Sequence, residues 1–259
     1  MLSLTTGQLE GLLVQYYWPF VRIAACFMVA PGFSAKFIPP RVRILLAGAV
    51  ALIVAPLVPV SAVVPFSLAG IIVTLQQVII GLSLGFVLQL IFDSLSMGGQ
   101  LLSNTMGLGF AFNVDPLRGV GTPVLGQLYM ILVTLTYLAL NGHLLLIEML
   151  VDGFATLPVG ASGLDSAAVW SVVTWGSQLF EGGLMVALPG MTALLVVNLA
   201  FGVMSRAAPS LNLFAVGFPV TLTFGLAITY FGLPAVQHTF VGSLDAAFAL
   251  IKLLLRLQQ

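Results

Sequence analysis

Residues 124–147 read VLGQLYMILVTLTYLALNGHLLLI, an apolar stretch without a charged side chain. A transmembrane helix needs roughly 20 apolar residues to cross the hydrocarbon core of a bilayer. The stretch meets that length and therefore predicts a membrane-spanning helix. Three further segments have the same character: Phe66–Phe92, Leu184–Met204 and Leu211–Leu233.

Two segments nearer the N-terminus are apolar but interrupted. Leu12–Phe33 contains Pro19 and Arg22, and Ile44–Val64 contains two prolines. Because proline removes a helical hydrogen bond, we expect these two helices to be bent or re-entrant. The tail, Val236–Leu257, is apolar but carries three charged residues. It predicts either a seventh crossing or an amphipathic helix at the membrane surface.

The composition supports the same fold class. Apolar residues make up 60% of the 259 residues and charged residues 6%, whereas soluble domains carry about 25% charged residues. Such a chain has too little polar surface to cover a water-soluble particle. We therefore expect an all-α integral membrane protein, with about six hydrophobic helices arranged as hairpins in a single membrane domain over residues 1–259.

The charge balance and the scarcity of reactive side chains exclude several function classes. The net charge is zero, so no positive field attracts nucleic acid. Cys26 is the single cysteine, which excludes an internal disulfide, and it is expected in the core. His143 and His238 lie on different segments, and no HExxH or GxSxG motif is present. We expect neither an enzyme nor a metal or cofactor site.

The positions of Lys and Arg predict the orientation of the chain, because short cytoplasmic loops are enriched in them. The basic loop residues follow the first, third and fifth segments, and so fall on one side: Lys36, Arg41, Arg43, Arg118 and Arg206. The N-terminus is therefore expected to face outward. Trp18, Trp170 and Trp175 would then lie toward the outer interface, where tryptophan is favoured.

Arg22 lies in the middle of the first segment. A charge near the bilayer centre costs at least about 2.5 kcal/mol, so it usually faces protein or water. Two interpretations are open. Arg22 pairs with an acidic residue of another helix, or it either snorkels to the interface or lies in a segment that is not a true span.

Other polar and small residues inside apolar segments predict helix packing. A buried amide is costly unless a neighbouring helix supplies a partner, and a small-xxx-small spacing lets two helix backbones approach closely. The residues that we assign to packing or to buried polar contacts are Arg22, Gln76, Gln77, Gly81, Gly85, Asn198 and Arg206.

The most unusual stretch is residues 97–123, MGGQLLSNTMGLGFAFNVDPLRGVGTP. Its glycines and prolines argue against a continuous helix. Its methionines, leucines and phenylalanines make it too apolar for an ordinary solvent loop. Non-helical backbone in a membrane protein is tolerated where it packs in protein or lines a cavity, so we expect a packed or pore-lining loop.

This loop and a second run resemble the FliR family of type III secretion export-gate proteins, which includes flagellar and injectisome members. The first match is Met106–Ala111 followed by Asp115-Pro116. The second is Asn198–Pro209, which reads NLAFGVMSRAAP and continues into Leu211–Phe214 and Val216–Pro219. Together with the region around Arg22 and residues 33–43, the resemblance covers nearly the whole chain.

The resemblance implies a core subunit of the flagellar type III protein export gate, in the bacterial inner membrane at the flagellar basal body. Family members assemble with FliP and FliQ, and FlhB and FlhA are further partners. Unfolded export substrates pass through the pore of the complex, and membrane lipid surrounds part of it. The resemblance also implies a FliP-like part over about residues 1–165 and a FliQ-like part over 166–259.

The glycine-rich loop acts as a plug across the central pore in that family. The residues of this chain that the resemblance assigns to the plug are Met106, Gly107, Leu108, Gly109, Phe110, Ala111, Phe112, Asp115 and Pro116. Glycines permit displacement of such a loop, and phenylalanines can close a narrow channel to water and ions. Because no nucleotide-binding motif is present, the energy for export must come from elsewhere.

Three alternatives stay open. The chain could be an injectisome export-gate homologue, since both branches share the motifs. It could be a secondary transporter for a small solute, which broken helices and a midplane charge such as Arg22 would suit. It could also be a scaffold without a pore role, which holds neighbouring subunits through glycine and amide faces.

Overall fold

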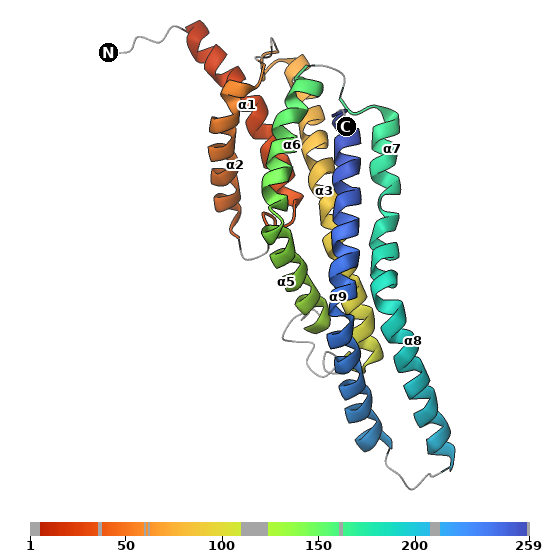
Figure 1. Ribbon diagram of the computed structural model, residues 1–259. Helices are drawn as coiled ribbons and strands as arrows, with labels where there is room; N and C mark the ends of the chain where they lie inside the picture. Colours follow the sequence, from red (N-terminus) through yellow and green to blue (C-terminus); the bar gives the residue numbers. More distant parts are fainter. Residues whose placement is uncertain are drawn as a thin grey trace. The chain divides into compact units, whose positions relative to one another are not determined.

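The computed structural model describes residues 6–35, 38–59, 61, 63–109, 124–160, 163–207 and 213–257 (Figure 1). Over these residues the regular structure is entirely helical. The elements are α1 (Thr6–Val29), α2 (Pro40–Val54) with the 3-10 turn η1 (Ala55–Leu57), α3 (Leu68–Thr105), α5 (Val124–Ala139), α6 (Gly142–Thr156), α7 (Ser166–Thr174), α8 (Ser177–Ala207) and α9 (Leu213–Leu254).

Five helical stretches of the described chain are long and apolar enough to cross a membrane, and the bent pair α5 and α6 makes a sixth. The prediction of an all-α integral membrane protein with about six hydrophobic helices is confirmed. The tail is neither a seventh crossing nor a separate surface helix, because α9 runs without a break from Leu213 to Leu254. Two prolines, Pro219 and Pro234, lie inside it.

Residues 124–147, the apolar stretch that predicts the fold most clearly, belong to two helices rather than one. α5 and α6 meet at an angle of 61°. Helix α5 ends at Ala139, and Asn141, the residue before α6, has a φ of 55°, a left-handed conformation that asparagine tolerates better than most residues. The next residue, Gly142, has the ring of Tyr137 directly against its backbone, so that a β-carbon there would collide with the ring.

Helix α3 extends much further than the sequence indicates. It continues through Gly98 and Gly99, although their sequence predicts a non-helical loop, and ends at Thr105. Its stop is at Gly107, where φ is 81°. There the Leu108 amide donates to the Ser103 carbonyl over 3.1 Å, the bond of a Schellman motif, in which a glycine takes the left-handed position.

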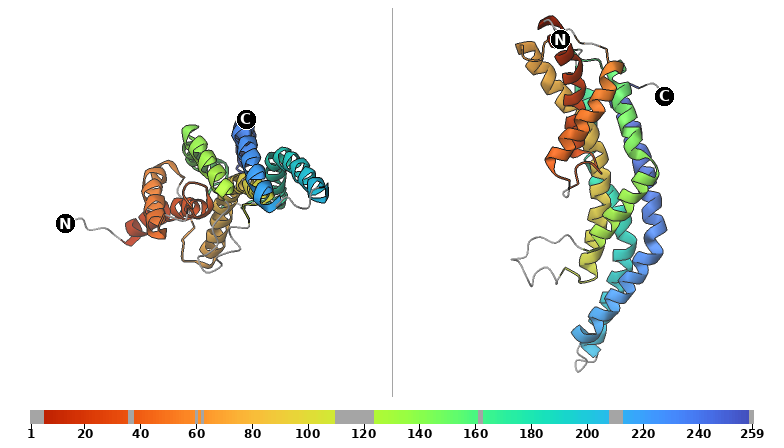
Figure 2. Two further views of the ribbon diagram at one scale, coloured as in Figure 1. Left: turned by 90° about the horizontal axis from the view of Figure 1, so that it is seen from below. Right: turned by 90° about the vertical axis from the view of Figure 1, so that its left-hand side faces the viewer.

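The chain folds into two compact units, each built from several segments. The first comprises Met1–Gln89, Tyr137–Trp175 and Asp245–Gln259. In it α1, α2, the first part of α3, α6, α7 and the end of α9 run side by side (Figures 1 and 2). Trp18 is 1% exposed and packs with Val14 and Val73 in this core, so it contacts protein rather than the membrane interface.

The second unit comprises Leu90–Thr136 and Gly176–Leu244. It contains the second part of α3, most of α5, and the antiparallel hairpin of α8 and α9 (Figure 1). Its core is a cluster of Leu102, Met106, Leu125 and Leu194. Glycines on α3 bring the helices close together, because a β-carbon on Gly98 would lie 2.9 Å from the Gly183 carbonyl oxygen of α8.

Candidate functional site

Arg22 is the largest charged side chain in the interior of the first unit, with no exposed surface. Pro19 lies three positions earlier within the same helix. The guanidinium Nε donates to Oε1 of Gln77 over 2.7 Å. Its two terminal nitrogens donate to backbone oxygens at the end of α6, that of Gly153 over 3.1 Å and that of Leu157 over 2.9 Å. The cation also lies 3.9 Å from the centre of the Phe154 ring.

These contacts correct both interpretations of Arg22. Among the described residues its bonding partners are an amide and two carbonyls rather than an acid, and a side chain without exposed surface does not snorkel. The physical reason is the end of α6. The last carbonyls of a helix have no partner within the helix and carry a partial negative charge, which a planar guanidinium fork can satisfy at two points.

Gly81 and Gly85 bring α3 against the helix that carries Arg22. A β-carbon on Gly81 would lie 2.9 Å from Cβ of Ala25, and closer still to the backbone oxygen of Arg22. One on Gly85 would lie 2.7 Å from the Cys26 oxygen. The two helices therefore touch through their backbones, which places Gln77, one turn earlier on α3, within reach of Arg22.

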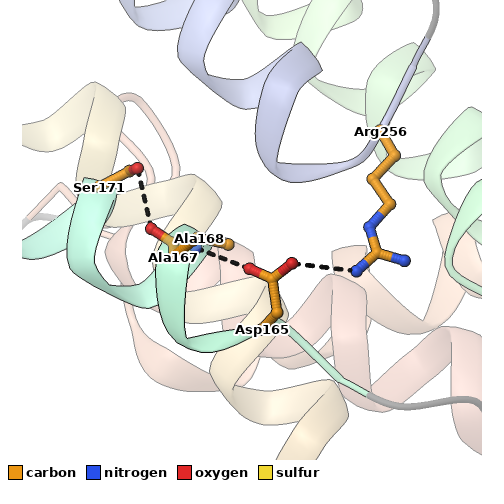
Figure 3. A network of polar contacts seen from close by, with 5 residues as sticks. All are labelled: Asp165, Ala167, Ala168, Ser171 and Arg256. Carbon is orange, nitrogen blue, oxygen red and sulfur yellow. Dashed lines mark hydrogen bonds and ion pairs between the residues drawn. The ribbon is translucent and has the colours of Figure 1, made fainter.

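The end of α9 is attached to the same unit. The Thr156 hydroxyl donates to the Leu255 oxygen over 2.5 Å. Asp165 caps α7 by accepting from the Ala168 amide over 2.7 Å, and its other oxygen lies 3.3 Å from the Arg256 guanidinium (Figure 3). Both charged side chains of this pair are about half exposed, so solvent weakens their attraction.

We expect the cap at Asp165 to matter more than the ion pair. An Asp165→Ala variant should lose about 1 kcal/mol of unfolding free energy, because the Ala168 amide loses its acceptor. Asp165→Asn keeps an acceptor oxygen and should lose only a few tenths of a kcal/mol of unfolding free energy. Thermal unfolding of the two variants and of Arg256→Ala measures the difference, and equal losses in all three would contradict it.

A groove of about 900 Å³ lies in the second unit at the end of α3, the end of α8 and the start of α9. The sequence stretches that carry the family resemblance meet there. Its lining residues are Asn104, Thr105, Met106 and Gly107 of the α3 end, Asn198, Phe201, Gly202 and Ser205 of α8, and Gly217, Phe218 and Thr221 of α9.

The groove lining is uncharged and mixes hydrogen-bonding groups with apolar side chains. The hydroxyl groups of Thr105, Ser205 and Thr221 donate to backbone carbonyls of their own helices. The carboxamides of Asn104 and Asn198 are exposed, and within the described chain they make no hydrogen bond. The side-chain amides of Asn104 and Asn198 thus each offer a donor and an acceptor that no other described residue of the groove bonds to.

The structure places the other predicted residues as follows. Met106 is fully buried and packs against Gly225 of α9, so it belongs to the core of the second unit. Gly107, Leu108 and Gly109 form the turn after α3. The remaining plug residues lie outside the described residues: Phe110, Ala111, Phe112, Asp115 and Pro116.

The predicted packing residues separate into three groups. Arg22, Gln77, Gly81 and Gly85 come together as described above. Gln76 is half-buried, and its amide oxygen has no partner among the described residues. Asn198 and Arg206 are exposed rather than buried, the first in the groove and the second just beyond its lining residue Ser205. In the described chain no three His, Cys, Asp or Glu side chains are grouped to hold a metal.

Sequence reasoning missed the acceptors of Arg22 and part of the groove. Gly153 and Leu157 act through backbone oxygens, which leave no signature in the residue type. Asn104, Thr105 and Thr221 lie in apolar runs like the amides that were singled out, and the same test of polar residues in apolar segments could have found them.

Residues 13–247 match the family described as bacterial export proteins, family 1. The chain belongs to this family. This family is the one that contains the FliR proteins, so the resemblance inferred from Met106–Ala111 and Asn198–Pro209 is confirmed.

Relatives in this export family come from several bacteria. The chain is 40% identical to the flagellar biosynthetic protein FliR of Escherichia coli strain K12 over 244 residues, 93% of this chain and 94% of that protein. It is 34% identical to FliR of Caulobacter vibrioides over 84% of this chain and 87% of that protein. FliR of Bacillus subtilis strain 168 is 25% identical over 78% and 80% of the two chains.

Proposed function

We propose that the chain is a core subunit of the flagellar type III protein export gate, in the bacterial inner membrane at the basal body. The observation that carries this proposal is the similarity over almost the full length to proteins named flagellar biosynthetic protein FliR. The apolar helices suit a membrane subunit. In this role the protein acts by assembly and conduction, and catalyses no reaction.

The proposed partners are FliP-like and FliQ-like subunits in a hetero-oligomeric complex, with FlhB and FlhA as further contacts. Large apolar side chains are exposed along α8, including Leu195, Val196 and Leu199, each at least 64% exposed. Contiguous apolar surface of this kind marks contact with protein or lipid. The proposed division into a FliP-like part up to residue 165 and a FliQ-like part from 166 belongs to the same proposal.

The proposed path is the pore of this complex, with the segment after Gly109 as its plug. The described residues of the second unit stop at Gly109 and resume at Val124. The residues between include Phe110 and Phe112, whose rings can exclude water and ions from a narrow channel. Glycines at 119 and 121 allow such a segment to be displaced by an unfolded substrate.

Deleting residues 110–119 should open the assembled complex to ions. The deletion leaves the α3 stop at Gly107 and the buried Met106 in place, so that the fold of the second unit is retained. We expect a large rise in conductance when the purified complex is inserted into a planar bilayer. A matched control replaces the same residues by a ten-residue stretch that keeps Phe110 and Phe112.

Three outcomes would contradict the proposal in different ways. A deletion variant that assembles fully and stays closed would exclude the plug and favour a scaffold. Failure to co-purify with FliP-like and FliQ-like subunits would exclude the gate itself. Solute uptake by the isolated chain in vesicles would instead identify a secondary transporter.

A further inference from the structure

The end of α9 belongs to the first unit, although α9 begins in the second. Residues 245–259 lie in the first unit, and the preceding part of the same helix lies in the second. The side chains of Ile251, Leu254 and Leu255 are at most 1% exposed. The other helices of the first unit are α1, α2, α6, α7 and the first part of α3, and all of them precede α8 in the chain. During synthesis the end of α9 therefore reaches this unit after its other helices.

Leu255 covers the end of α6 at the hydrogen bonds of Arg22. A β-carbon on Gly153 would lie 2.8 Å from Cδ2 of Leu255, so this side chain rests directly on the Gly153 backbone. The oxygen of Gly153 accepts a hydrogen bond from Arg22. Nearby on α6, the Thr156 hydroxyl donates to the backbone oxygen of Leu255. The end of α9 is thus fixed on the same turn of α6 that holds the guanidinium.

The contact between α1 and α3 is made without α9. Nε of Arg22 donates to Gln77 of α3, and the two helix backbones touch at Gly81 and Gly85. Cys26 lies in this contact, with a side chain that has no exposed surface. All of these residues precede α5 in the chain. The contact between α1 and α3 can therefore form before α9 is present.

The end of α9 is packed less completely on the side that faces α7. A cavity of about 190 Å³ lies between these two helices, and Leu157 and Leu254 are among its lining residues. The ion pair of Arg256 with Asp165 joins the same two elements (Figure 3). Because both of its side chains are about half exposed, this pair contributes little to stability. Incomplete packing of this kind favours local opening over unfolding of the whole unit.

From these observations we infer that residues 251–256 form a closing strap of the first unit. The strap docks on the end of α6 after α1 and α3 have packed, and it seals the hydrogen bond between Arg22 and Gly153 from solvent. Because α9 is one continuous helix that follows α8, the strap closes only after both helices have been made. Completion of the first unit thus depends on synthesis of the α8–α9 hairpin. This inference is independent of the proposed role in export.

Cysteine labelling of the full-length protein in detergent tests the strap. Leu157→Cys, combined with Cys26→Ala, places a thiol beside the strap at a position that is 3% exposed. Leu255→Ser then removes the side chain that rests on Gly153. We expect the rate of maleimide labelling at position 157 to rise at least about ten-fold, because loss of a buried leucine side chain favours local opening.

Two further variants keep the apolar core of the unit intact. Lys252→Ser is the matched control, since Lys252 is exposed on the same part of α9 and does not line the cavity. It should leave the labelling rate at position 157 unchanged. Thr156→Val removes only the hydrogen bond to the oxygen of Leu255, and we expect the rate to rise about three-fold. This variant decides the question even if Leu255→Ser is recovered in low yield.

Native Cys26 reports separately on the contact between α1 and α3. In a chain without Leu157→Cys, the Leu255→Ser substitution should leave Cys26 protected. Equal gains in labelling at positions 26 and 157 would show that the unit opens as a whole, and no gain at position 157 would show that Leu255 closes nothing. Either result overturns the strap. During cell-free synthesis into phospholipid vesicles, protection of Cys26 should precede protection at position 157, and simultaneous protection would overturn the order of closure.

Discussion

An Arg22→Met variant will unfold at a markedly lower temperature than the parent protein. Methionine fills similar space but donates no hydrogen bond, so Oε1 of Gln77 and the oxygen of Leu157 lose their donors. Each buried acceptor left without a partner costs about 1–3 kcal/mol. Together they predict a loss of roughly 2–6 kcal/mol, which makes this the substitution with the largest expected effect in the chain.

The conservative variant separates charge from geometry. Arg22→Lys keeps the positive charge, but an ammonium group lacks the planar fork that reaches three acceptors on α3 and α6. We expect Arg22→Lys to be nearly as destabilised as Arg22→Met. Thermal unfolding of the detergent-purified protein measures both. If lysine restored full stability, the positive charge alone would be responsible. The stabilising role proposed here for the guanidinium hydrogen bonds to the end of α6 would then be wrong.

A Gln77→Leu variant completes the test. It removes the side-chain oxygen that accepts the hydrogen bond from Nε of Arg22. The losses of stability caused by Gln77→Leu and Arg22→Met should therefore be strongly non-additive in a double-mutant cycle. Additive effects would show that the 2.7 Å hydrogen bond between the two side chains contributes nothing to stability.

Adding methyl groups to α3 at Gly81 and Gly85 will force it away from α1. In the Gly81→Ala, Gly85→Ala double variant, each new β-carbon would lie within 3.0 Å of atoms of the facing helix, including the Cys26 backbone oxygen. Backbone atoms cannot move aside as a flexible side chain can. Overpacking costs about 1–3 kcal/mol at one site and more where strain accumulates, so little folded protein should be recovered from membranes.

Gly48 supplies the matched control for this prediction. It lies inside α2, and a β-carbon there would meet no atom within 4 Å. Alanine is favoured over glycine in a helix by about 1 kcal/mol, so Gly48→Ala should be neutral or slightly stabilising. Size-exclusion profiles of the fluorescently tagged proteins give the yield. Equal yields of the control and the double variant would show that α1 and α3 do not pack through their backbones.

The sequence predicted which segments are helical far better than where they end. Runs of apolar residues determine helix and membrane class, because burial of every backbone polar group in lipid requires a helix. The ends depend on neighbours. Gly98 and Gly99 resemble a loop in sequence, yet they continue α3 because Gly126 and Gly183 of adjacent helices pack against them. That contact is not encoded in the local pattern.

The candidate sites were predictable to different degrees for a similar reason. Met106 and Asn198 could be singled out as members of two unusual stretches, but their meeting in one groove follows from the fold. Arg22 stood out as a buried charge, whereas its acceptors are mostly backbone oxygens. Any residue type carries such an oxygen, so the sequence pointed toward an acidic partner that Arg22 does not use.

The length of α9 limits how this subunit can exist by itself. Its 42 residues extend about 63 Å at about 1.5 Å per residue, twice the roughly 30 Å of a hydrocarbon core. A tilt of about 40°, the upper end for membrane helices, would still leave about 48 Å along the bilayer normal. Exposed apolar side chains occur from Phe218 to Leu253. Some of them must then meet water in a lone subunit, so a cell that makes this chain in excess of its partners produces a target for membrane quality control.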